Sequence, residues 1–223
     1  MIEKPRHHFS LQLASSVWNA LVVPGKRWLI LEERNEVRRE VTITAIDFEN
    51  KKIVWQNDSL PEPWWINLLS VSPRHVSLKI FENTANPDIT RIVSLSLEDG
   101  KMLDGQIENE AGYTNEVQQP FQYVAGEPEF KTVKDFLKTR LNIIPLLGAE
   151  YLEAIHFIFI SYYFGNPGAF TNVLACFTKA GELLWNEEIG TNLKGIGINT
   201  FFIAYDFLFF VKNKSELVTF RIV

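Results

Sequence analysis

Two histidines occupy places where residues of one catalytic or metal-binding site would be found. His75 and His156 each stand at the start of an apolar segment, and these segments have comparable places in two copies of an internal repeat described below. Together with a carboxylate such as Glu153, two imidazoles can bind a divalent metal or transfer protons. This pattern predicts a hydrolase or lyase with a central cleft. The alternative is structural, with each histidine hydrogen-bonding a turn.

The tryptophans offer binding chemistry instead of catalysis. Trp64 and Trp65 are adjacent, and neighbouring residues of a strand point to opposite faces, so both cannot enter one core layer. One of the two is therefore our candidate for an exposed aromatic anchor that binds a ligand or partner. Trp55 and Trp185 share a repeat position, which packing between neighbouring units explains better than a stacking groove does.

Motifs of familiar enzyme classes are missing from the sequence, including the nucleophile elbow, the zinc helix, the phosphate-binding loop and the C-x-x-C pair. The single Cys176 lies in an apolar run, which is typical of a buried thiol. Gly195-Ile196-Gly197 precedes a strand, so it indicates a strand-entry turn and not a dinucleotide loop. We therefore expect no cofactor and no bound metal. A non-catalytic binding or scaffold module is favoured over the enzyme.

An internal repeat supplies the elements that must position these residues. Three segments align without a gap, namely residues 45–55 (AIDFENKKIVW), 94–104 (SLSLEDGKMLD) and 175–185 (ACFTKAGELLW). Each of them is a strand, a tight polar turn and a second strand. Asn50, Gly100 and Gly181 lie in or next to the turns, where residues that tolerate a positive φ are favoured.

Two more strands precede each copy, so the repeating unit has four strands. A fourth copy ends before its last strand, and the alternating segment Phe9–Leu13 is the candidate to complete it. Such a pairing would protect the last sheet edge and close a ring. The prediction is an all-β fold, a small propeller-like array of about four four-stranded units in one domain, residues 1–223. The units are about 14–57, 60–107, 150–190, and 195–223 with 9–13.

Residues 45–55 and 175–185 resemble the repeat of quinoprotein-type propellers, in which a small residue, an Asp, a Gly and a Trp recur in each blade. Here the Asp is kept as Asp47, and the Trp as Trp55 and Trp185. The aromatic-rich layout of four units is also similar to that of a small bacterial family of unknown function. The resemblance implies a propeller-like fold and supplies no activity. The paired cysteines and cofactor-stacking residues of quinoproteins have no identifiable counterparts.

An insertion, about residues 108–149, separates the second and third units. The stretch 104–129 contains six acidic residues and no Lys or Arg, which indicates an exposed excursion. Thr132 and Asp135 fit a helix start, and the apolar spacing that follows predicts a short helix over 133–141. The insertion is either a binding loop for a basic or metal-associated ligand, or a helix that caps an incompletely closed sheet assembly.

Composition narrows the class of partner. Lys+Arg 22 against Asp+Glu 27 gives a net charge of −5 without a basic block, so we expect neither a nucleic-acid nor a membrane partner. The 17 Phe, 6 Trp and 6 Tyr favour sheet. The first residues contain no apolar signal segment. The expectation is a cytoplasmic protein whose partner is another protein or a small molecule.

Overall fold

The structure is a computed structural model that describes residues 3–83, 85–104, 117–154 and 156–222. These residues form β-strands and one helix, and their strands make four separate sheets, none of which closes on itself. The chain divides into two compact units. Leu13–Asn115 is called the middle unit here, and Met1–Gln12 with Glu116–Val223 is called the terminal unit.

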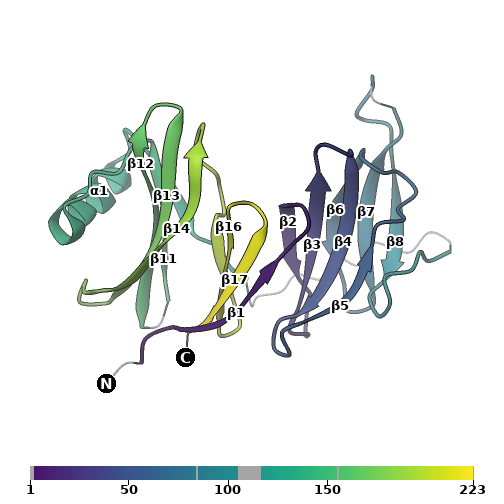
Figure 1. Ribbon diagram of the computed structural model, residues 1–223, viewed down its shortest axis with the longest axis horizontal. Helices are drawn as coiled ribbons and strands as arrows, with labels where there is room; N and C mark the ends of the chain where they lie inside the picture. Colours follow the sequence, from purple (N-terminus) through teal and green to yellow (C-terminus); the bar gives the residue numbers. More distant parts are fainter. Residues whose placement is uncertain (1–2, 84, 105–116, 155, 223) are drawn as a thin grey trace. The chain divides into compact units, whose positions relative to one another are not determined.

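Two antiparallel sheets make up the middle unit (Figure 1). The first contains β2 (Ser16–Val22), β3 (Trp28–Asn35), β4 (Glu40–Asp47) and β5 (Lys52–Asn57), and the second contains β6 (Ile66–Val71), β7 (His75–Phe81) and β8 (Thr90–Ser96). Their facing side chains form one apolar core, which includes Ile30 and Ala45 of the first sheet and Leu68 and Leu78 of the second. Alternation along each strand places these residues on one face.

The second sheet of the middle unit has fewer strands than the repeat predicts. Its expected fourth strand is reduced, among the described residues, to a single bridge between Leu95 and Met102. The turn between them is as predicted, because Gly100 has a φ of 71°. Residues 105–116, which contain the end of the predicted second unit and part of the acidic excursion, lie outside the described residues.

Two five-stranded sheets and the helix make up the terminal unit. One sheet has the order β1–β17–β16–β15–β9 and the other runs from β10 to β14 in sequence order. The strands are β1 (Arg6–Gln12), β9 (Val117–Gln118), β10 (Phe121–Val124), β11 (Gly148–Glu153), β12 (Phe157–Asn166), β13 (Ala169–Thr178), β14 (Leu183–Leu193), β15 (Phe201–Ala204), β16 (Phe207–Lys212) and β17 (Glu216–Arg221), and the helix is α1 (Pro128–Leu141).

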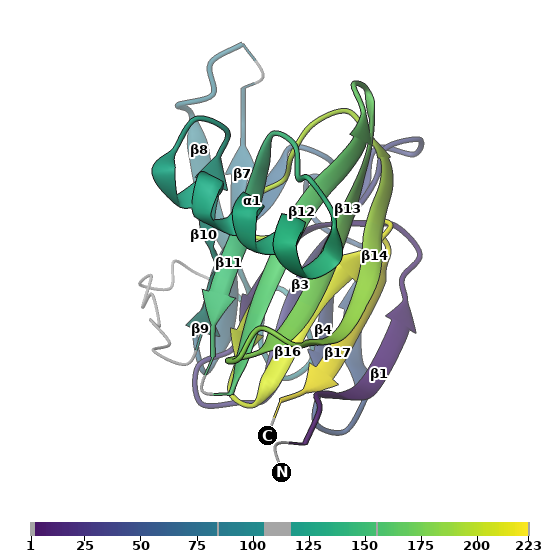
Figure 2. The same cartoon turned by 90° about the vertical axis from the view of Figure 1, so that its left-hand side faces the viewer.

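The sheet of β10 to β14 is the middle layer of the terminal unit. Along β12, Phe157 and Phe159 pack toward β15 to β17, whereas Ile160 and Tyr162 pack against α1. Figure 2 shows the helix lying across this sheet. Both faces of β12 are therefore covered, which explains why its sequence is almost continuously apolar.

The first and last strands of the chain pair with each other. β1 lies antiparallel to β17, with Leu11 opposite Leu217 and Gln12 opposite Glu216, and Figure 1 shows the two strands side by side. The sequence predicts this pairing from the alternation in Phe9–Leu13. The strand begins earlier than expected, at Arg6.

The insertion contains more structure than the sequence predicts. β9 and β10 fall within the stretch expected to be an exposed excursion, and they add a fifth strand to each sheet of the terminal unit. The helix starts five residues before the predicted Val133, because Pro128 occupies its first turn and suits that position. Thr132 hydrogen-bonds the Pro128 carbonyl from inside the helix and does not cap it.

Candidate binding surface

His75 is packed inside the middle unit, at the start of β7. It is 4% exposed, and its Nδ1 lies 3.0 Å from Ser72 Oγ. Ser72 Oγ also accepts the His75 backbone N–H. These bonds close the turn before β7, which is the structural alternative for this histidine.

His156 and Glu153 lie close in the sequence of the terminal unit, but their side chains contact different residues. The exposed His156 ring contacts Phe157 edge-on at 6.2 Å between ring centroids. Glu153 forms an ion pair with Lys179 and accepts a hydrogen bond from Tyr151. These two contacts lower the pKa of Glu153, with Lys179 as the larger cause.

Two properties of the described residues bear on metal binding and on nucleophilic chemistry. These residues include no cluster of three or more His, Cys, Asp or Glu that could hold a metal ion. Burial raises the pKa of the Cys176 thiol, which keeps it protonated and weakly nucleophilic at neutral pH. Their single helix is too short to cross a membrane.

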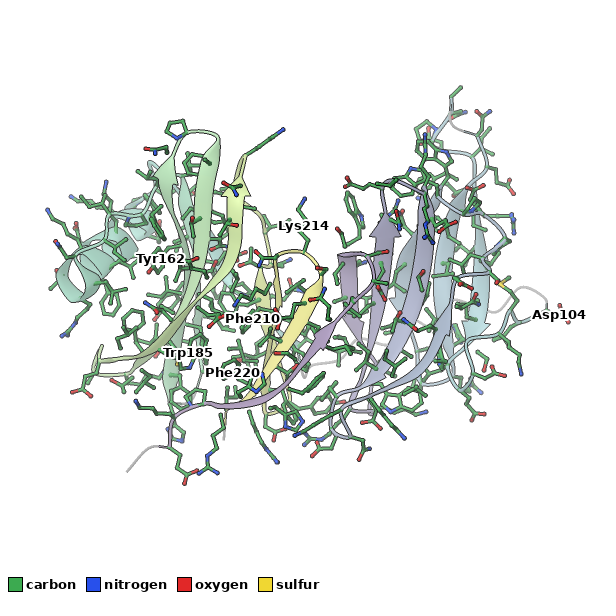
Figure 3. The ribbon with its side chains drawn as sticks, in the orientation of Figure 1. Asp104, Tyr162, Trp185, Phe210, Lys214 and Phe220 are labelled. Carbon is green, nitrogen blue, oxygen red and sulfur yellow. The ribbon has the colours of Figure 1, made fainter. Side chains whose placement is uncertain are left out.

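The tryptophans that share a repeat position pack between neighbouring sheets. Trp55 of β5 donates its Nε1–H to the Leu97 carbonyl at 2.7 Å, and its ring lies against Gly100 in the turn after β8. Trp185 of β14 stacks on Phe220 of β17 with 4.9 Å between ring centroids. Figure 3 shows Trp185 and Phe220 close together. Both rings are structural, as their shared position predicts.

A different set of aromatic and basic residues lies on the surface of the middle unit. The Trp–Arg cluster consists of Trp18, Arg34, Arg39, Trp64 and Trp65. The guanidinium carbon of Arg34 lies 5.1 Å from the Trp18 ring centroid and 5.0 Å from that of Trp64. The guanidinium of Arg39 lies 5.6 Å from the Trp64 centroid. These distances are in the range of cation–π attraction.

Arg34 is held rigidly by internal bonds. It is 9% exposed, and its Nε donates to Glu32 Oε1 at 2.7 Å. Its Nη2 donates to the carbonyl of Ile66 and to Oδ1 of Asn67, both at 2.6 Å, and its Nη1 donates to the Trp64 carbonyl at 3.2 Å. The guanidinium is thus a fixed platform for the rings, and four of its five N–H donors are used by these bonds.

Glu32 and Arg34 also satisfy the backbone of an edge strand. β6 lies at one edge of its sheet, where N–H and C=O groups have no neighbouring strand. Glu32 Oε2 accepts the N–H of Leu68 at 2.7 Å, and Asn19 Nδ2 donates to the Leu68 carbonyl at 3.3 Å. With the bond from Arg34 to Ile66, side chains of β2 and β3 take the place of a fourth strand beside β6.

Local backbone irregularities aim the aromatic rings outward. Val17 pairs with Glu33 and Asn19 with Glu32, so Trp18 is the extra residue of a β-bulge. Bulges redirect a side chain relative to its strand, and Trp18 is 65% exposed.

Trp64 and Trp65 lie in the turn before β6 and not within a strand. Glu62 Oε1 accepts both of their backbone N–H groups, at 3.0 and 3.1 Å. Trp64 packs partly against the core, while Trp65 is 43% exposed. The adjacent rings thus have different surroundings, with Trp65 as the more exposed of the two.

The sequence pointed to Trp64 and Trp65 but not to the residues that support them. Glu32 and Arg34 follow the apolar residues of β3 on its core-facing side, and charges at such positions are a signal for a buried ion pair. Trp18 carried no distinguishing pattern, because the bulge that exposes it depends on pairing with β3.

Known families cover part of the middle unit. Residues 22–103 match the family described as domain of unknown function (DUF4905). No curated protein matches the chain. The matched span includes Arg34, Arg39, Trp64 and Trp65, and Trp18 lies just before it. The middle unit is therefore similar to a domain whose function is itself not described.

Proposed function

We propose that the protein is a non-catalytic binding or scaffold module that contacts its partner through the Trp–Arg cluster. The observation that carries this proposal is the exposure of Trp18, at 65%, beside the buried Arg34, which uses four of its five N–H donors internally. Trp65, at 43% exposure, follows Trp64, whose ring also lies against Arg34. Exposed aromatic rings on rigid supports are frequent centres of protein interfaces. Their immobility also reduces the entropy lost on binding.

The charges around the rings favour a particular kind of partner. Arg39 is exposed and stacks on Trp64, so it adds a positive charge beside the aromatic surface. A protein segment or small molecule with an apolar, planar group next to a carboxylate suits this combination. The overall charge of −5 disfavours nucleic acid and anionic membrane as partners.

We also propose that the four sheets are blades of a small propeller-like array within one domain. The repeat supports this idea, because Trp55 and Trp185 occupy the same repeat position and each packs on the next sheet of its unit. The pairing of β1 with β17 completes the last sheet with a strand from the other end of the chain. Closed blade arrays use the same device.

The hydrolase or lyase built on His75, His156 and Glu153 has weaker support. His75 is engaged in closing a turn, and Glu153 is paired with Lys179. A binding role needs neither residue.

Comparative capture from native lysate tests the proposal. We expect the wild-type chain to retain one or more proteins that the double variant Trp18→Ala, Trp65→Ala loses. Ile92→Ala is the matched control, because Ile92 is an exposed apolar residue of β8 in the same unit and its loss should not change capture. Retention of every captured protein by the double variant, or no capture by the wild type, would contradict the proposal.

A further inference from the structure

A row of polar side chains crosses the middle sheet of the terminal unit. Glu150 of β11, Ser161 and Tyr163 of β12 and Asn172 of β13 are all buried, on the face whose other residues pack toward β15 to β17. The segment 194–200, which connects β14 to β15, supplies the remaining members of the row.

Glu150 stands at one end of a continuous set of hydrogen bonds. Its Oε2 accepts the backbone N–H of Thr200 at 3.0 Å and is also hydrogen-bonded to Thr200 Oγ1. Thr200 Oγ1 lies 2.9 Å from Ser161 Oγ, and Ser161 Oγ lies 2.8 Å from Asn172 Oδ1.

Tyr163 stands at the other end. Its hydroxyl oxygen accepts the Asn172 Nδ2–H at 3.1 Å and the Gly197 backbone N–H at 2.8 Å. Gln122 Nε2 donates to the carbonyl of the same glycine at 2.8 Å. Segment 194–200 is thus attached to the sheet at two points, Thr200 and Gly197.

Counting hydrogens shows which form of Glu150 fits these contacts. Three oxygen–oxygen links run from Glu150 through Thr200 and Ser161 to Asn172 Oδ1, and each link needs one hydrogen. The two hydroxyl groups supply one hydrogen each, and an amide oxygen supplies none. With Oδ1 of Asn172 facing Ser161 and Nδ2 facing Tyr163, the third hydrogen is the carboxyl proton of Glu150, so this orientation of the amide fits the neutral acid.

Loss of that proton requires the links to reverse. Thr200 must then donate to Glu150 and Ser161 to Thr200. The amide of Asn172 must rotate so that its Nδ2 donates to Ser161 while its Oδ1 accepts from Tyr163. Ionisation of Glu150 therefore propagates along the whole row to the residue that holds Gly197.

We propose that Glu150 is a proton-operated latch, which holds segment 194–200 against the sheet while its carboxyl group is neutral and loosens it on ionisation. Glu150 Oε1 is buried and has no hydrogen-bond partner among the described residues. A neutral carbonyl oxygen tolerates this position much better than a carboxylate oxygen, because an unpaired buried charge is far more costly. The ionised state is relieved by opening the segment to water.

Burial raises the pKa of Glu150, and the hydrogen bonds from Thr200 and from the backbone of Asn199 oppose the change. An acid with a raised pKa in the closed state stabilises that state at low pH, and this stabilisation is lost as the pH rises through the raised pKa. The latch is therefore closed in acid and weakened toward neutral pH.

The groups that face Glu150 add no competing pH dependence to that of the latch. Its cross-strand neighbours Gln122 and Ser161 are uncharged, as is Asn172. Burial raises the pKa of Tyr163 to about 12, with Gly197 lowering it and Glu150 raising it further. Tyr163 thus stays neutral in the range of interest, and Lys194 of the segment is exposed.

Amide hydrogen exchange of Gly197 and Thr200, measured from about pH 4 to about pH 8, tests the latch. In the wild-type chain we expect the protection factors of both amides to fall as the pH rises, by about tenfold for each unit that the pKa is raised. In Glu150→Gln, a neutral isostere, they should be independent of pH. Glu33→Gln is the control, because Glu33 is another buried carboxyl with a raised pKa, in the middle unit, and should leave the dependence intact.

Two results would overturn the latch. One is a wild-type protection factor that does not change with pH, and the other is a dependence that persists in Glu150→Gln. A carboxyl carbon titration of wild-type Glu150 by NMR serves if the variant does not fold. A Glu150 pKa at or below the ordinary value would then reject the proposal.

Discussion

Arg34 of β3 hydrogen-bonds the edge strand β6 of the neighbouring sheet, and its loss should destabilise the middle unit. Arg34→Met keeps most of the side-chain volume but leaves the buried Glu32 without its cation. Breaking a buried pair on one side costs about 3–5 kcal/mol in the free energy of unfolding. Arg91→Ala is the control, because its pair with Glu82 is nearly half exposed and should contribute about 1 kcal/mol or less. Urea denaturation of both variants checks this, and equal losses would contradict it.

At the scale of residues, the sequence pointed to Trp64 and Trp65 as candidates but not to the residues that support them. The inference that the two tryptophans have different environments rested on strand alternation, and this premise was wrong, because both residues lie in the bend before β6. The role of Glu32 could not be foreseen, because it accepts a backbone N–H from a residue 36 positions away in the chain. Such long-range bonds depend on how the two sheets meet, which no local pattern encodes.

Gly100, in the turn after β8, is required for two reasons. Gly100 has a φ of 71°, and an added Cβ would lie 2.5 Å from the Trp55 ring. Gly100→Ala should therefore lower the free energy of unfolding by about 2–5 kcal/mol, from crowding and backbone strain together. Gly25→Ala, with a φ of 69° and open space around it, should cost about 1–2 kcal/mol from strain alone. Similar losses in the two variants would show that the contact with Trp55 is unimportant.

At the scale of elements, alternation and turn residues predicted the strands well, but the pairings of very short strands were not predicted. The hairpin from β4 to β5 and the strand near the amino terminus follow from local pattern. The two-residue strand β9 pairs with β15 across a long stretch of sequence, so its sequence alone cannot distinguish it from a loop. The start of α1 was misplaced because Pro128 was a better first-turn residue than the Thr132 motif.

For the whole molecule, the pairing of the first and last strands predicts that the amino terminus stabilises the fold. Removing residues 1–12 deletes β1 and exposes the apolar edge of β17. We expect a loss of about 2 kcal/mol or more, which lowers the thermal midpoint by about 4–8 °C. A chain lacking only residues 1–3 should melt like the wild type, because β1 begins at Arg6. An unchanged midpoint after the longer deletion would refute this role of β1.

The four sheets could be anticipated from the repeat, but the strand number in each could not. Among the described residues the sheets have four, three, five and five strands. The fourth strand of the second sheet is reduced to one bridge, and β9 and β10, which the repeat does not include, add a strand to each sheet of the terminal unit. The position of the proposed binding surface also required the structure, since Arg34 contacts both Trp18 and Trp64, which lie far apart in the sequence.

The most direct test of the proposed function is calorimetric titration of a captured partner with wild-type and Trp65→Ala protein, together with their thermal midpoints. Trp65 is exposed and lies in a turn, so its replacement should leave the midpoint unchanged. If the ring is an interface hot spot, its loss costs about 2 kcal/mol or more, which raises Kd by about 30-fold. An unchanged Kd for a folded Trp65→Ala protein would contradict the account.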